Sequence, residues 1–284
     1  MGGGFDWPVR RAFLALTTVG VALLAGCAGS QDEGVEHVHA LGVDPADGAL
    51  YAASHHGVFR IQPGGTAQRV GTSIQDTMGF VVIGPRHFLA SGHPAPDEKG
   101  PPNLGLIEST DAGVTWRPVA LSGEVDFHAI DVAQDGIIGY DSQSQQIMVS
   151  SDRKTWERRA RLMLADLAVS PADPQFMLAT TAEGLVHSAN GGRSFAPVDG
   201  VPTLQLLDWP VENAIIGVGP TGIVGSSNDR GATWIKMGTV EGAPAALTTN
   251  GPQQVYVATD RGIYLSKDAG HTFSLLYAMT SEEH

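Results

Sequence analysis

One short pattern, S-x-D-x-G-x-T-W, returns along most of the chain and limits what the chain can fold into. Clean copies occupy residues 109–116, 227–234 and 266–273, a looser copy occupies 188–195, and a copy that is one residue short occupies 150–156. Their starting positions lie 41, 38, 39 and 39 residues apart. This period matches the length of one four-stranded propeller blade, so the repeat predicts a ring of equivalent β-sheets.

Each position of the repeated segment has a physical role in a tight hairpin connection. The Asp or Asn side chain accepts hydrogen bonds from backbone N–H groups further along the segment. The Gly supplies a positive φ, the hydroxyl residue bonds locally, and the aromatic residue packs between neighbouring sheets. The segment is therefore predicted to be structural, not catalytic.

The chain divides into six such units. Its 36 glycines and 17 prolines, with few long helical periodicities, favour an all-β fold. An apolar inner strand is expected to open each unit, at residues 37–44, 78–84, 127–133, 164–170, 203–209 and 244–249. We predict a six-bladed β-propeller of four-stranded antiparallel blades. Because every unit begins on an inner strand and ends on an outer one, blades one and six are expected to close the ring by packing alone.

The first residues read as an export signal. Arg10 and Arg11 precede an uncharged run at residues 12–26, which is too short and too rich in small residues for a stable membrane span. The run ends in Leu24-Ala25-Gly26-Cys27, and Cys27 is the one cysteine of the sequence. This tetrapeptide resembles a bacterial lipobox, which implies that Cys27 carries a lipid.

The predicted organisation is a signal peptide at residues 1–26, a flexible spacer at 27–36 and the propeller at 37–284. The resemblance implies a lipid-anchored protein on the outer side of the membrane in the cell envelope, exported by the Sec or the twin-arginine route. With a formal net charge of −13, the chain is a poor partner for nucleic acid. The lipid is then the expected membrane contact, beside a metal ion or small ligand and, as an alternative, a protein partner.

Histidines gather at one predicted face of the disc. In a propeller the inner strands start and the second strands end at the same face of the disc. Six of the ten histidines occupy such positions in the first three blades: His37, His39, His55, His56, His93 and His128. Neutral imidazole is a common ligand for copper and zinc, so the six are predicted to hold one of these metals.

Three further residues are expected to surround this metal. Asp76, Met78 and Tyr140 fall on the same predicted rim, where they are expected in the second shell. Met78 would favour copper if it points inwards, because a thioether is a soft ligand. The alternative interpretation is that the histidines line a wet channel mouth and form hydrogen bonds to loops.

The repeated segment resembles the Asp-box (BNR) repeat of sialidases and sortilin-type receptors, in which the box lies far from the ligand face. The whole chain is similar to bacterial Asp-box lipoproteins labelled glycosyl hydrolase-like. The stretches that carry this likeness are His37-Val38-His39, His55-His56-Gly57, Asp76-Thr77-Met78-Gly79-Phe80, Ser91-Gly92-His93-Pro94, Asp126-Phe127-His128 and Tyr140-Asp141-Ser142.

The resemblance leaves an enzyme as an alternative hypothesis. Sialidases need three arginines around the substrate carboxylate, but only Arg261 falls on a predicted ligand-face loop, so sialidase activity is disfavoured. Another glycoside hydrolase would use paired carboxylates as general acid and as base or nucleophile, with Asp126 and Asp141 as the candidates. A protein-docking scaffold, which needs neither metal nor carboxylates, is the third hypothesis.

Overall fold

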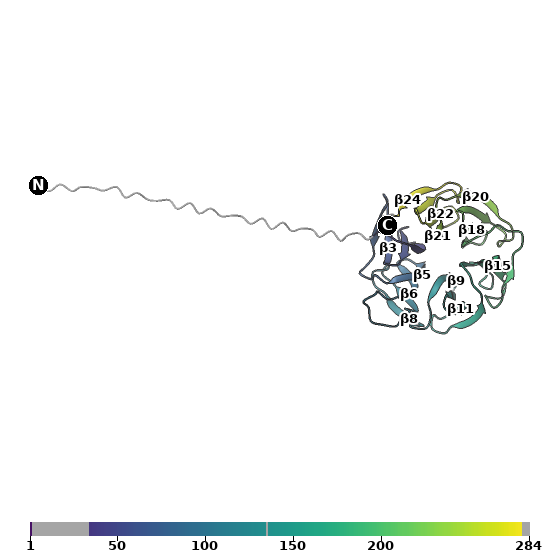
Figure 1. Ribbon diagram of the computed structural model, residues 1–284, viewed down its shortest axis with the longest axis horizontal. Helices are drawn as coiled ribbons and strands as arrows, with labels where there is room; N and C mark the ends of the chain where they lie inside the picture. The colour runs from purple at the N-terminus through teal and green to yellow at the C-terminus, as the bar shows by residue number, and fades with distance from the viewer. Residues whose placement is uncertain (2–33, 135, 280–284) are drawn as a thin grey trace. The chain divides into compact units, whose positions relative to one another are not determined.

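A computed structural model describes Met1, residues 34–134 and residues 136–279 of the chain. The part that forms the domain is all-β, with six four-stranded antiparallel sheets arranged in a ring (Figure 1). This confirms the predicted six-bladed propeller. The predicted signal peptide, Cys27 and most of the spacer lie outside the described residues. Within the described part, no helix has the length and apolar character needed to cross a membrane.

In each blade the four strands follow one another in sequence from the channel outwards. The inner strands are β1 (Val38–Val43), β5 (Asp76–Gly84), β9 (Phe127–Ala133), β13 (Asp166–Val169), β17 (Leu206–Val211) and β21 (Pro244–Asn250). The second strands are β2 (Leu50–Ser54), β6 (His87–His93), β10 (Gly136–Asp141), β14 (Met177–Thr181), β18 (Ala214–Val218) and β22 (Gln254–Thr259).

The outer two strands of each blade are joined by the repeated segment wherever it is present. The third strands are β3 (Gly57–Gln62), β7 (Leu106–Ser109), β11 (Gln146–Ser150), β15 (Gly184–Ser188), β19 (Ile223–Ser227) and β23 (Gly262–Ser266). The fourth strands are β4 (Thr66–Arg69), β8 (Arg117–Ala120), β12 (Glu157–Arg161), β16 (Ala196–Pro197), β20 (Ile235–Thr239) and β24 (Ser274–Ala278).

The repeated segment forms a dense local hydrogen-bond network. In blade 5 the Asp229 carboxylate accepts the Thr233 backbone N–H at 2.9 Å, the Thr233 hydroxyl at 2.5 Å and the Ser227 hydroxyl at 2.8 Å. Gly231 has a φ of 84°, as expected, but Arg230 also adopts a positive φ of 59°. Two successive left-handed residues make a tight hairpin turn of the kind that suits twisted strands.

The core is divided among the junctions between blades. Six hydrophobic clusters are present in the described part of the chain, and each one joins two neighbouring blades. Between blades 1 and 2, Phe88 packs edge-on against Tyr51 and Phe80, with ring centroids 4.9 and 5.4 Å apart. Burial of such side chains, at roughly 1.5–3 kcal/mol each, fixes the blades to one another.

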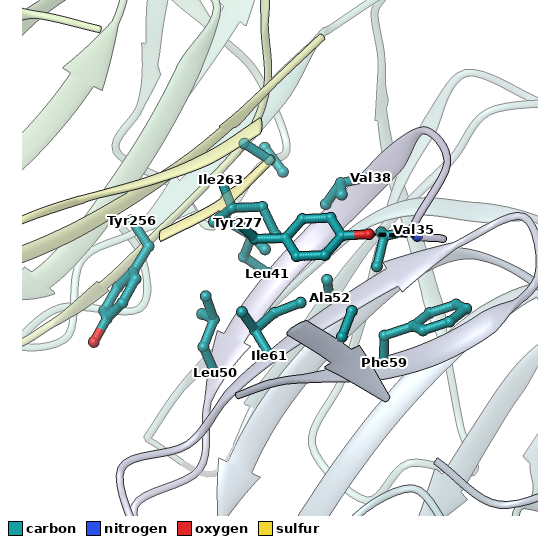
Figure 2. Packing of buried hydrophobic residues seen from close by; sticks show 13 residues of the cluster. Val35, Val38, Leu41, Leu50, Ala52, Phe59, Ile61, Tyr256, Ile263 and Tyr277 are labelled. Atoms are coloured by element: carbon teal, nitrogen blue, oxygen red, sulfur yellow. Dashed lines mark hydrogen bonds between the residues drawn. The ribbon is translucent and has the colours of Figure 1, made fainter. Parts of the chain in front are cut away.

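Blades 6 and 1 close the ring by packing, as the sequence predicts. Figure 2 shows Tyr277 of β24 lying across the apolar side chains of β1, with its hydroxyl directed at Val35. The Val35 N–H donates to this hydroxyl at 3.1 Å in a buried hydrogen bond. No strand is exchanged between the first and last described sheets, so this apolar junction and its hydrogen bond hold the ring shut.

Candidate metal centre

The candidate site begins with an irregularity shared by three neighbouring inner strands. In β1 the pairing register shifts between Val38 and Ala40, which leaves His39 as an extra residue opposite β2. The same shift makes Met78 the extra residue of β5 and His128 that of β9. Bulges of this kind re-aim side chains and are common at barrel rims and active sites. His39 and His128 both line the central channel.

Three ligand atoms from two blades converge at the channel rim. His39 Nε2 lies 3.2 Å from His55 Nδ1, and His55 Nδ1 lies 3.0 Å from Asp76 Oδ1. His39 Nε2 lies 3.6 Å from the same Asp76 oxygen. His55 directly follows β2 and Asp76 opens β5, so the group spans the junction of blades 1 and 2. In the described part of the chain, these ligand atoms all lie within 4.8 Å of one another.

The three separations match the geometry of a small tetrahedral metal ion. With metal–ligand bonds of about 2.0–2.1 Å, the ligand atoms of a tetrahedral site lie roughly 3.3 Å apart. The observed separations of 3.2, 3.0 and 3.6 Å bracket this value. Two imidazole nitrogens and one carboxylate oxygen would form one face of such a tetrahedron. Three protein ligands with one open position are typical of catalytic zinc sites.

The electrostatics of the group suit a cation. Burial lowers the pKa of His39 to about 4, and the neighbouring His55 ring acts in the same direction, while Asp76 opposes them. His39 is therefore neutral at neutral pH and keeps a lone pair for a metal. The side chains of His39 and Asp76 are 19% and 27% exposed, so the group is half-buried but open to solutes.

Two of the other predicted histidines lie beside this group. His37 adopts a left-handed backbone conformation with a φ of 44°, and its ring centroid lies 5.5 Å from that of His55. His56 turns towards Glu36, with Nε2 and Oε2 3.6 Å apart. Sequence reasoning did not single out Glu36, because the segment before the first strand carries no periodic pattern.

The remaining two histidines meet at the junction of blades 2 and 3. His128 Nε2 lies 2.8 Å from Asp126 Oδ2, and His93 Nε2 lies 3.6 Å from the same oxygen. Burial on its own raises the pKa of Asp126, but the hydrogen bonds from His128 and Ser142 hold that pKa below its usual value. The carboxylate is therefore ionised at neutral pH. The six histidines thus divide into two neighbouring groups.

Two predicted residues have clear packing or structural roles. Tyr140 is 6% exposed and packs in the apolar cluster between blades 3 and 4. Asp141 is 2% exposed; one of its oxygens accepts the Asp126 backbone N–H at 3.1 Å, and the other accepts the N–H and hydroxyl of Ser144. The contacts of Asp141 therefore fix the loop after β10.

Sequence reasoning missed three carboxylates deeper in the channel: Asp131, Asp166 and Asp208. Burial within the ring raises the pKa of Asp131 to about 6 and that of the other two to about 7. Asp131 accepts the Val169 N–H of the next blade at 2.7 Å, and Asp166 accepts the Leu207 N–H at 2.8 Å. They connect neighbouring blades, a role that strand periodicity does not reveal.

No family model matches the chain. In sequence it is similar to a xyloglucanase from Hypocrea jecorina, with 32% identity over 170 residues that cover 56% of this chain. The chain spans only about a fifth of that protein, 20% of its length.

Solved structures share the fold at low sequence identity. A gluconolactonase from Xanthomonas campestris has 14% identity and a TM-score of 0.63 over 80% of this chain and 84% of its own. A GH74 xyloglucanase from the same organism has 16% identity and a TM-score of 0.56, covering 85% of this chain and 45% of its own. YCF48 bound to D1 peptide has 14% identity and a TM-score of 0.53, covering 86% of this chain and 83% of its own. These likenesses establish the propeller fold.

Proposed function

We propose that this propeller binds a transition metal, copper or zinc, at the channel rim through His39, His55 and Asp76. The observation that carries the proposal is the mutual spacing of the three ligand atoms, 3.2, 3.0 and 3.6 Å. Hydrogen bonding alone is a weaker account of this spacing. His55 Nδ1 carries at most one hydrogen, yet it faces both another imidazole nitrogen and a carboxylate oxygen. A cation satisfies all three lone pairs together.

Metal content of the purified protein tests this proposal. After dialysis against zinc or copper and removal of free metal, wild-type protein should retain the ion, and the His39→Ala and His55→Ala variants should lose it. His271→Ala is the matched control, because His271 is exposed on the repeated segment of blade 6. Metal retained equally by all three variants would refute the proposal.

We further propose that the chain is an exported lipoprotein of Asp-box type, held by a lipid on Cys27 at the outer side of the membrane. The support is the Leu24-Ala25-Gly26-Cys27 tetrapeptide together with the five repeated segments. Mass spectrometry of protein from the membrane fraction tests the anchor. A diacylglycerol-modified Cys27 is expected, and a Cys27→Ser variant should leave that fraction.

A glycoside hydrolase is the second candidate function, favoured by the 32% identity with a xyloglucanase. The structure assigns different tasks to the two predicted carboxylates. Both oxygens of Asp141 accept hydrogen bonds within its own blade, so Asp126 is the better catalytic candidate. Wild-type protein would release reducing sugar from xyloglucan, and Asp126→Asn would abolish the release. No release by wild-type protein, with or without added zinc, would exclude xyloglucan hydrolysis.

A further inference from the structure

The group at blades 1 and 2 has a counterpart one blade further round the ring. The second-strand residue that pairs with the inner-strand residue just before the bulge is Ser54 in blade 1 and Gly92 in blade 2. In both blades the next residue is a histidine, His55 or His93. Asp76 and Asp126 each stand two residues before the bulge residue of their inner strand. The equivalent pairs are His55 and His93, Asp76 and Asp126, and His39 and Met78. Each group thus combines two residues of one blade with the aspartate of the next.

His93 of the counterpart and the neighbouring His128 are both oriented as metal-binding histidines usually are. His93 Nδ1 donates to the Pro102 carbonyl at 3.0 Å, so in the neutral ring Nε2 presents its lone pair to Asp126 Oδ2, 3.6 Å away. His128 donates from Nε2 to Asp126 at 2.8 Å, which leaves its Nδ1 lone pair free for a ligand. A ring N–H held by a carbonyl or carboxylate is the common support of metal-binding histidine.

The Asp126 carboxylate has unused bonding capacity. Its residue is 4% exposed, and Oδ1 accepts no hydrogen bond from any described residue, although Oδ2 accepts the Ser142 hydroxyl at 3.0 Å. A buried carboxylate oxygen normally has a hydrogen-bond donor or a cation as its partner. This observation is independent of the register argument, and it too indicates a cation at this junction.

The insertion in blade 2 supports the same group. Residues 94–103 lengthen the loop between β6 and β7, and Pro102 in this loop supplies the carbonyl that orients His93. The next residue, Asn103, is 4% exposed and accepts the Gln143 side-chain N–H from blade 3 at 3.2 Å. The insertion therefore lies across the junction of blades 2 and 3 and is tied to both blades.

We propose that this junction is a second metal centre, formed by His93 Nε2, the Asp126 carboxylate and the Met78 thioether, and that it takes cuprous copper. This inference rests on the proposed function, since it takes the first group as a metal site. Met78 occupies the bulge position in β5 that His39 occupies in β1. The soft thioether favours Cu(I) and disfavours zinc, whereas the two imidazoles and carboxylate of the first group accept both zinc and copper. The two centres differ in metal preference because one bulge residue differs.

Copper stoichiometry of the full chain tests the second centre. Protein is titrated anaerobically with Cu(I), kept reduced by ascorbate, against a chromophoric Cu(I) chelator. Wild-type protein should bind two ions. His93→Gln and Met78→Leu should each bind one, and so should His55→Gln, while His271→Gln should still bind two. Met78→Leu conserves volume, so its fold should be retained.

A parallel titration with Zn(II) separates the two centres. We expect one tightly bound zinc ion, lost in His55→Gln and retained in Met78→Leu. A single Cu(I) lost in His55→Gln but not in His93→Gln would overturn the second centre and leave the proposed function intact. Loss of an ion in His93→Gln but not in His55→Gln would support the second centre and refute the first. Two Cu(I) ions in Met78→Leu would overturn the assignment of the thioether.

Discussion

The hydrogen bond that closes the ring allows a quantitative prediction. Tyr277 is 7% exposed, and its hydroxyl accepts the N–H of Val35, which is 1% exposed, at 3.1 Å (Figure 2). In Tyr277→Phe the ring is kept, but the buried N–H loses its acceptor, at a cost of about 1–3 kcal/mol. For a domain of this size, each kcal/mol corresponds to about 2–4 °C in Tm. A fall in Tm of roughly 2–12 °C is therefore expected.

Urea unfolding followed by tryptophan fluorescence measures the change in unfolding free energy. Tyr256→Phe is the matched control, because Tyr256 lies in the same apolar cluster but its hydroxyl has only a 3.5 Å contact with Gln254. The control should lose less than about 0.5 kcal/mol. Equal losses in the two variants would show that the Val35 hydrogen bond does not contribute to closure.

Two further predictions concern Asp229, a carboxylate that accepts three local hydrogen bonds, and Asp208, a carboxylate whose pKa is raised by burial. Asp229→Ala removes the acceptor of three local hydrogen bonds in the blade 5 hairpin, and should lower the unfolding free energy by about 1–3 kcal/mol in urea. Ala substituted at the exposed control position Lys267 should have little effect. Burial raises the pKa of Asp208 from 3.8 to about 7. Its stabilising contribution is therefore fully present below about pH 4 and is lost as the pH rises to about 7. The difference in stability between wild-type protein and Asp208→Asn should shift against wild type between about pH 4 and pH 7, and a shift in the opposite direction would contradict the raised pKa.

The fold was predictable because one pattern, repeated at a near-constant period, specifies the same hairpin in successive blades. The gathering of the histidines on three neighbouring blades was also predictable, since inner strands start and second strands end at one face. Which histidines and carboxylates lie next to one another within that face was not predictable. An extra residue at a bulge leaves no mark in the spacing of apolar residues, so the sequence does not reveal how His39 is presented. An oxygen of Asp76, which is expected in the second shell, lies within 4.8 Å of ring nitrogens of His39 and His55.

The bonding partners of the channel and rim carboxylates indicate which of them are available to a ligand. Each carboxylate oxygen of Asp131 and Asp166 accepts a backbone N–H, one within its own blade and one from the next. These two carboxylates are committed to joining blades, and burial keeps their pKa values raised. Asp76 and Asp126 instead face imidazole nitrogens across blade junctions.

An ionised carboxylate beside neutral imidazoles attracts a cation, whereas a carboxylate satisfied by amide groups has little left to offer one. A channel carboxylate therefore serves stability where the next strand supplies N–H groups, and we propose that a rim carboxylate serves ligand binding where the loops supply histidines. On this reasoning, exchanging Asp166 for Ala should weaken the fold without changing metal content. Exchanging Asp76 for Ala should remove the metal and leave the unfolding free energy of the metal-free protein nearly unchanged. Equal effects of the two exchanges on metal content would contradict this division.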